Sequence, residues 1–194
     1  MQIGWPLMGS CWFWFQGTVF TALLPLYVAK SGMAEEAASI FLLSTTLGVA
    51  AGALAANQLV SRISPMLLAL GLVPLIVLPI VGFAVLPHGA DALGVGRLAL
   101  DLFVSSAGAG FYLVPLTAAI QRLTPPQERA RFVGISHTLS GFAMCLGGAS
   151  IFVFPLIGFS VIDTFVLLAL VTGGVGAMSL LRTLRPRDQR SINV

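Results

Sequence analysis

Two charged residues stand one helical turn apart in an otherwise apolar stretch. Arg97 and Asp101 have the i, i+4 spacing that lets opposite charges pair on one face of a helix. An acid inside a membrane segment is costly unless it is paired. Two interpretations of Asp101 therefore remain open: a structural ion pair with Arg97, or a group that binds a polar headgroup or carries a proton.

Two further polar residues lie within apolar segments. Gln16 either makes a hydrogen bond to a neighbouring helix or lines a polar pathway. His137 has Gly141, Met144 and Gly148 on or near its helical face. Its imidazole either carries a proton or touches a headgroup, or it is hydrogen-bonded to a neighbouring helix.

The helix that must position Asp101 is predicted to run from Gly96 to about Ile120. At ~1.5 Å per residue it is long enough to cross a hydrocarbon layer of ~30 Å. Its two faces, read at i, i+3 and i+4 spacing, differ. One face carries Asp101, Ser105, Gly108, Tyr112, Pro115 and Ala119, and the other carries Leu100, Phe103, Ala107, Phe111, Val114 and Ala118. Pro115 frees a backbone carbonyl that only protein or water can satisfy, so the first face is predicted to point inward and the second toward lipid.

The composition is that of a membrane protein. Of the 194 residues, 57% are hydrophobic and 9% are charged, against roughly 25% charged residues in soluble domains. The formal net charge is +3, but the basic residues are not interleaved with aromatics as on a nucleic-acid surface. Cys11 and Cys145 lie in apolar segments without CxxC spacing, which indicates small core residues rather than a disulfide or a metal site.

Six apolar segments are each long enough to span a bilayer. They cover residues 3–28, 37–60, 65–86, 96–120, 132–156 and 161–181, so the sequence predicts an all-α, polytopic unit over residues 1–181, followed by a basic tail over residues 182–194. The arginines after the second, fourth and sixth segments outnumber Lys30 and Arg97 on the opposite side. The positive-inside rule therefore places both termini in the cytoplasm.

Local signals add three expectations. Thr124 and Gln127 have the spacing of a capping box, with Pro125 at the first position of a new helix. Asp163 is expected to cap the last helix through its dipole. Small residues at four-residue spacing predict close helix packing; they are Ser44, Gly48, Gly52 and Ala56 in the second segment, and Ala169, Gly173 and Ala177 in the sixth.

Motifs for catalysis are missing from the sequence. There is no P-loop, no G-x-S-x-G and no HExxH. Neither His88 nor His137 is followed five residues later by Asp, as in the His-Asp pair of glycerolipid acyltransferases, and His88 has only Asp91 as a nearby candidate ligand. The sequence therefore predicts no catalytic residue, no metal site, no cofactor and no nucleic-acid partner.

Three stretches resemble the major facilitator superfamily and, more narrowly, its lysophospholipid transporters. The first is S-C-W-F-W-F-Q-G-x-x-F-T-x-L-L-P-L-Y from Ser10, and the last is G-F-Y-L-V-P-L-x-A-x-I-Q followed by T-P-P-x-E-R-A-R, which ends with Arg129 and Arg131. Between them, the short loop that starts at Gly52 resembles the superfamily's cytoplasmic motif through Gly52, Leu54 and Arg62. Ala56 stands where that motif has its acidic residue, so this copy lacks the carboxylate of a gating salt bridge.

The resemblance implies the C-terminal six helices of a twelve-helix transporter, built from two inverted three-helix repeats. The first and fourth helices would line the central cavity, which assigns Gln16, Asp101, Ser105 and Tyr112 to the cavity wall, with His137 as a further candidate. The implied activity is inward movement of lysophospholipid across the bacterial inner membrane by alternating access. Two alternatives stay open: efflux of a small solute or drug on the same fold, or a non-transporting membrane anchor for a phospholipid acyltransferase.

Six helices form half of such a cavity, so the inward face requires a partner. A truncated or split gene product is the expected explanation, with the missing N-terminal six-helix half as partner, and a second copy of the chain is the alternative. Beyond the bilayer and an amphiphilic substrate, an acyltransferase is a further possible partner.

Overall fold

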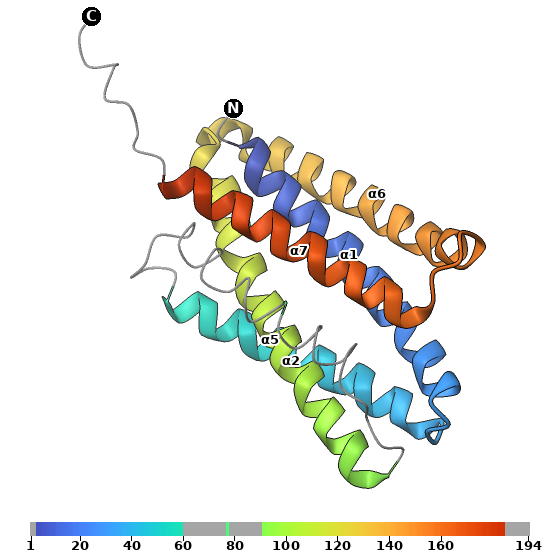
Figure 1. The fold of residues 1–194 in the computed structure, drawn as a ribbon. Coiled ribbons are helices and arrows are strands. Elements are labelled where there is room, and N and C mark those ends of the chain that lie inside the picture. The colour runs from blue at the N-terminus through green and yellow to red at the C-terminus, as the bar shows by residue number, and fades with distance from the viewer. Residues whose placement is uncertain (1–2, 60–76, 78–90, 185–194) are drawn as a thin grey trace, which may run out of the picture.

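The computed structural model describes residues 3–59, 77 and 91–184, with side chains up to residue 177, and this part of the chain is helical (Figure 1). The helices are α1 (Gly4–Lys30), α2 (Glu36–Leu59), α5 (Ala92–Leu123), the 3-10 helix η1 (Pro126–Glu128), α6 (Arg129–Leu156) and α7 (Val161–Leu184). The predicted all-α, polytopic fold is confirmed. The third apolar segment, residues 65–86, lies outside the described residues apart from Val77.

The described helices alternate in direction, as in a bundle that crosses a membrane repeatedly. The start of α1 and the turn between α5 and α6 lie at one end, whereas the α1–α2 and α6–α7 turns lie at the other (Figure 1). Four described helical spans, Gly4–Lys30, Glu36–Leu59, Ala92–Leu123 and Pro126–Leu156, are long and apolar enough to cross a membrane. The apolar part described for α7, Val161–Ala177, is shorter.

Glycines bring the backbones of α2 and α5 into direct contact. A Cβ built on Gly48 would overlap the carbonyl oxygen of Phe103, and one built on Gly52 would overlap the carbonyl of Ala107. From the other side, a Cβ on Gly110 would overlap the carbonyl of Val49. Only glycine leaves room for this approach, so the predicted packing role of the small residues in α2 is confirmed.

A second pair, α1 and α6, uses a similar contact. A Cβ on Gly147 of α6 would lie 2.8 Å from the carbonyl oxygen of Phe15 and 3.3 Å from Cβ of Thr18. The hydroxyl oxygens of Ser10 and Ser140 lie 3.4 Å apart between the same two helices. Small residues thus let α1 pack closely against α6, as they let α5 pack against α2.

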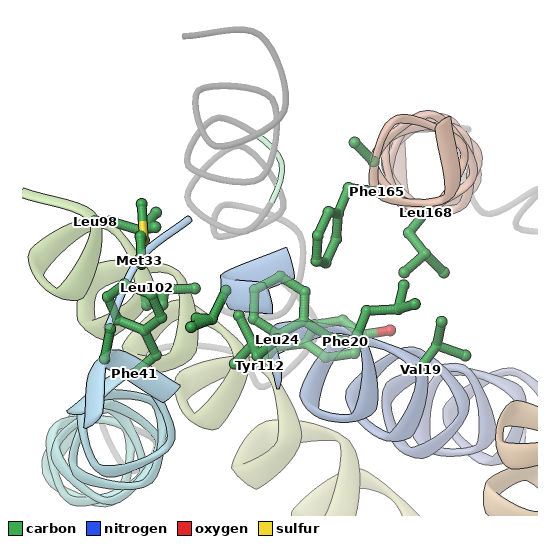
Figure 2. Packing of buried hydrophobic residues seen from close by; sticks show 14 of the residues in the cluster. Val19, Phe20, Leu24, Met33, Phe41, Leu98, Leu102, Tyr112, Phe165 and Leu168 are labelled. Carbon is green, nitrogen blue, oxygen red and sulfur yellow. The ribbon is translucent and has the colours of Figure 1, made fainter. Parts of the chain in front are cut away.

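The buried apolar cluster is centred on α1 (Figure 2). Phe20 of α1 meets Phe165 of α7 edge to face, with ring centroids 5.3 Å apart. Leu24 of α1 and Phe41 of α2 are fully buried in the same cluster, which also includes Tyr112 of α5. One continuous core therefore ties α1 to α2, α5 and α7.

Small residues pack less uniformly in α7 than in α2. Ala169 is buried, whereas Ala177 is exposed and the nearest atom to a Cβ on Gly173 would be a methyl carbon of Val77, 3.9 Å away. The packing prediction for α7 is therefore confirmed only at Ala169.

The start of α7 is closed by a reciprocal cap. The Ser160 N–H donates to Oδ2 of Asp163 (2.9 Å), and the Asp163 N–H donates to Oγ of Ser160 (3.2 Å). Gly158, just before it, has φ of 89°, a conformation that favours glycine in the turn from α6. The predicted capping role of Asp163 is confirmed.

The turn from α5 to α6 differs from the sequence expectation. Thr124 ends α5, where its hydroxyl donates to the Ile120 carbonyl (2.7 Å), and among the described residues its oxygen accepts no hydrogen bond from the Gln127 N–H. The Glu128 N–H donates to the Pro125 carbonyl (2.9 Å), which makes a 3-10 turn that starts at Pro126. The predicted capping box is therefore wrong, because Thr124 ends α5 and the next helical turn begins at Pro126 with Pro125 before it.

Substituting Gly52 tests the backbone contact between α2 and α5. We expect Gly52→Ala to lower the free energy of unfolding by about 1–3 kcal/mol, because the added methyl overlaps the Ala107 carbonyl and forces the helices apart. Gly17→Ala is the matched control, since a Cβ there meets nothing within 4 Å. It should be neutral or stabilise by up to about 1 kcal/mol. Denaturant titration in detergent, followed by tryptophan fluorescence, measures both; equal effects would contradict the contact.

Candidate functional site

The face of α5 predicted to point inward is buried. Ser105, Tyr112 and Pro115 are buried, and Asp101 is half-buried one turn beyond exposed Arg97. The structure thus confirms the direction of this face. Whether Arg97 and Asp101 form an ion pair stays a prediction.

The opposite face of α5 was predicted to contact lipid, and this is only partly correct. Leu100 is 61% exposed, but Phe103 and Ala107 are half-buried, and their carbonyls meet the glycines of α2. The physical reason is that α2 packs on backbone atoms, which an analysis of side-chain polarity does not detect.

Tyr112 points its hydroxyl at the backbone of α1. A Cβ built on Gly9 would lie 2.6 Å from Oη of Tyr112 and 3.0 Å from Cδ1 of Leu116. The side chain belongs to the buried cluster and is 9% exposed (Figure 2). Within the described part of the chain its hydroxyl makes no hydrogen bond, and the side chain is buried between α1 and α5.

A polar network joins α1 to α7. The indole N–H of Trp12 donates to Oγ1 of Thr172 (3.1 Å). The Thr172 hydroxyl lies 2.7 Å from Oε1 of Gln16 and 2.7 Å from the Leu168 carbonyl, and its single proton serves one of these acceptors at a time. Gln16 therefore has the helix-helix hydrogen bond that was one of its two interpretations. Its role in a polar pathway stays a prediction.

The aromatic residues next to Gln16 form an ordered surface on α1. The rings of Trp12 and Phe15 stack at 5.5 Å with an interplanar angle of 24°, and Phe13 meets Trp14 edge to face at 5.3 Å. Residues 11–18 are all half-buried. This stretch therefore combines large apolar surfaces with an amide group at the same level of the helix.

His137 lies apart from these residues. It is exposed on α6, and the three glycines near it along the helix, Gly134, Gly141 and Gly148, have nothing within 4 Å of a built Cβ. Of the predicted site residues, Ser105 and Tyr112 share the buried face of α5, Gln16 contacts α7, and His137 points away from the helices described.

Sequence reasoning missed several residues that build this region. Thr172, Gly9, Ser140 and Gly147 all make contacts between helices, yet none was singled out. Gly147 carried a usable signal, because it stands in a Gly-Gly pair within an apolar helix. Thr172 carried none, since a lone threonine in a membrane helix usually bonds to its own backbone.

The cytoplasmic motif has a different placement from the one predicted. Gly52 and Leu54 lie inside α2, which continues to Leu59. The predicted apolar segment 37–60 is thus confirmed there, and the loop that was assigned from Gly52 was wrong for these two residues. Gly52 instead packs against α5. Arg62 lies outside the described residues, and Arg129 and Arg131 are exposed at the start of α6.

Metal and thiol chemistry have little support in the part of the chain that the structure describes. No group of three or more His, Cys, Asp or Glu side chains gathers there as a metal site would require. Cys11 and Cys145 are both free thiols, and Cys145 is exposed rather than the core residue expected.

Long apolar helices joined by backbone contacts, with amide and hydroxyl groups held between them, define a polytopic α-helical membrane protein. The sequence profile of the Major Facilitator Superfamily matches residues 2–148. The chain therefore belongs to the major facilitator superfamily, whose members are membrane transporters rather than enzymes. Searches of curated proteins and of solved structures found no match.

Replacing Thr172 tests the network between α1 and α7. We expect Thr172→Val to lower the free energy of unfolding by about 0.5–2 kcal/mol, because Trp12 loses its acceptor and Gln16 its donor. Thr117→Val is the control, since that exposed hydroxyl donates only to the Leu113 carbonyl within its own helix. Denaturant unfolding measures the stability of both variants. A double-mutant cycle of Thr172→Val and Gln16→Leu then gives the coupling free energy between these two residues. Strict additivity of Thr172→Val and Gln16→Leu would contradict the network.

Tyr112 and Gly9 provide a compensation test of the contact between α1 and α5. Gly9→Ala should destabilise the protein by about 1–2 kcal/mol, because the new Cβ overlaps the phenolic oxygen. Tyr112→Phe in the same chain should recover part of this loss, with Leu116 still 3.0 Å from the Cβ. Thermal unfolding in detergent compares the single and double variants. If Tyr112→Phe destabilises the Gly9→Ala protein further, the hydroxyl does not face Gly9.

Proposed function

We propose that this chain supplies the C-terminal six-helix half of a transporter that moves lysophospholipid inward across the bacterial inner membrane by alternating access. One observation carries the proposal: α1 holds the stacked rings of Trp12 and Phe15 beside the Gln16 amide within a membrane span. An amphiphile with one acyl chain needs an apolar surface and polar groups at the same level of the bilayer.

The chemistry of the candidate residues fits a zwitterionic headgroup. Oε1 of Gln16 accepts from Thr172, while its amide nitrogen makes no hydrogen bond to the other described residues and is available to donate to a phosphate oxygen. Half-buried Asp101 supplies a carboxylate on α5 for an ammonium group. Lysophosphatidylethanolamine carries both groups, and the resemblance of Ser10–Tyr27 and Gly108–Arg131 to lysophospholipid transporters favours it.

The open face of α6 supports a partner within the membrane. Gly134, Gly141 and Gly148 repeat at seven-residue spacing, and a Cβ on any of them would meet nothing within 4 Å. Small residues in a membrane helix permit close approach of another helix. We infer that an N-terminal six-helix half packs there, with a second copy of the chain as the alternative.

Charge at the two ends of the bundle supports cytoplasmic termini. Arg122 lies in the last turn of α5, and Arg129 and Arg131 lie in the first turn of α6. The turn between these two helices lies at the same end of the bundle as the start of α1 (Figure 1). The positive-inside rule favours the cytoplasm for that end.

Uptake by spheroplasts tests the proposal. Labelled lysophosphatidylethanolamine should enter spheroplasts that express this chain with the N-terminal half of a lysophospholipid transporter faster than spheroplasts that lack the chain. Gln16→Leu and Asp101→Asn should each lower the initial rate by about three- to tenfold, the equivalent of one lost hydrogen bond. Membrane insertion, measured in the same membranes, should be unchanged.

Thr117→Val serves as the matched control, because Thr117 is exposed on α5 and bonds only within its helix. Its uptake rate should equal that of the unmodified chain. Uptake of a different solute from a panel, with no uptake of lysophospholipid, would favour small-solute or drug transport. Insertion without any uptake, together with co-purification of an acyltransferase, would favour a membrane anchor.

A further inference from the structure

Three arginines surround the turn between α5 and α6, which we define as the basic turn, residues 122–131. Arg122 lies in the last turn of α5, and Arg129 and Arg131 lie in the first turn of α6. All three are exposed, and none makes a hydrogen bond or an ion pair to the other residues that the structure describes. The transport proposal uses these arginines only to orient the chain in the membrane and gives them no ligand.

The backbone of the basic turn is fixed close to the helix ends. Thr124 is 3% exposed, and its hydroxyl donates to the Ile120 carbonyl (2.7 Å). The Glu128 N–H closes a 3-10 turn on Pro125 (2.9 Å), and two successive prolines restrict the chain further. The arginines are therefore held at the ends of α5 and α6, next to the turn that joins them.

Apolar side chains on the same helices lie next to the arginines. Leu123 is 39% exposed, and Ile135 and Leu139, one and two turns into α6 from Arg131, are 40% and 42% exposed. Exposed leucine and isoleucine suit acyl chains, and guanidinium groups beside them lie at the level of lipid headgroups.

The charge of the basic turn contrasts with the other end of the bundle. Three arginines and Glu128 give a net charge of +2 at the turn. The opposite end carries two basic residues, Lys30 and Arg97, against four acidic ones, for a net charge of −2; the acidic residues are Glu35, Glu36, Asp91 and Asp163. All the basic residues of the turn are arginines, which bind phosphate oxygens in a bidentate manner.

We propose that the basic turn binds the phosphate groups of anionic phospholipids in the adjoining leaflet. The guanidinium N–H groups donate to the non-bridging phosphate oxygens, and Leu123, Ile135 and Leu139 contact the acyl chains. A membrane lipid is favoured over an acidic protein segment because exposed apolar side chains border the arginines. Acyl chains would cover these side chains, whereas a soluble acidic segment would leave them exposed to water. This surface serves lipid binding independently of the transported solute.

Binding of fluorescent phosphatidylglycerol to the full chain in a neutral detergent tests the proposal. The anisotropy of the labelled lipid reports the Kd at low salt, with labelled phosphatidylcholine as the neutral comparison. Each Arg→Gln substitution at positions 122, 129 and 131 should weaken phosphatidylglycerol binding roughly fivefold. Substituting all three by lysine should retain part of the affinity, because the charge persists without the bidentate geometry.

Lys30→Gln is the matched control, since it removes one basic charge at the opposite end and should leave the Kd unchanged. Circular dichroism checks helix content. If the variant with glutamine at all three positions does not fold, two other measurements test the proposal. They are the Kd of the single variant Arg131→Gln and the salt dependence of phosphatidylglycerol binding by the unmodified chain. Equal binding of both lipids, or an equal effect of Lys30→Gln and Arg131→Gln, would each overturn the proposal.

Discussion

The backbone contact between α2 and α5 is the constraint on which the rest of the described structure depends. Lipid is as apolar as leucine, so burial of apolar surface does not hold membrane helices together, and close packing must do so. Gly48 and Gly52 meet carbonyl groups of α5, and Gly110 meets a carbonyl of α2. These contacts fix the rotation of α5 and thereby direct Tyr112 toward α1.

The helices pair in a crossed manner that fits two three-helix repeats. If α1 opens the first repeat and α5 the second, each opening helix packs against the second helix of the other repeat: α1 against α6, and α5 against α2. In both pairs a glycine of the second helix, Gly147 or Gly48, meets a carbonyl of the opening helix. This is the arrangement expected of inverted repeats, in which one packing solution is used twice.

The sequence predicted the helices well, because each has to be apolar over the thickness of the bilayer. It also predicted the inward face of α5 and the cap at Asp163, where the signal is local. The errors concern one local feature, the end of α5, and contacts between helices. Thr124 was misassigned because it ends α5, where its hydroxyl donates to the Ile120 carbonyl, and does not begin the next helix. The partnership of Gln16 with Thr172 joins residues far apart in the chain, and no spacing rule reveals it.

Polar groups within the described helices fall into two sets. Most threonine hydroxyls donate to a carbonyl one turn back, as Thr18 does to Trp14 and Thr117 to Leu113. Because the acceptor lies in the same helix, these hydroxyls need no further partner in a bilayer. Other groups have no partner among the described residues, including the hydroxyls of Ser105 and Tyr112, the amide nitrogen of Gln16 and the imidazole of His137. An unpartnered polar group is costly in a dry interior. Of these groups, the transport proposal relies on the amide nitrogen of Gln16, which water, another part of the protein or a polar solute would satisfy.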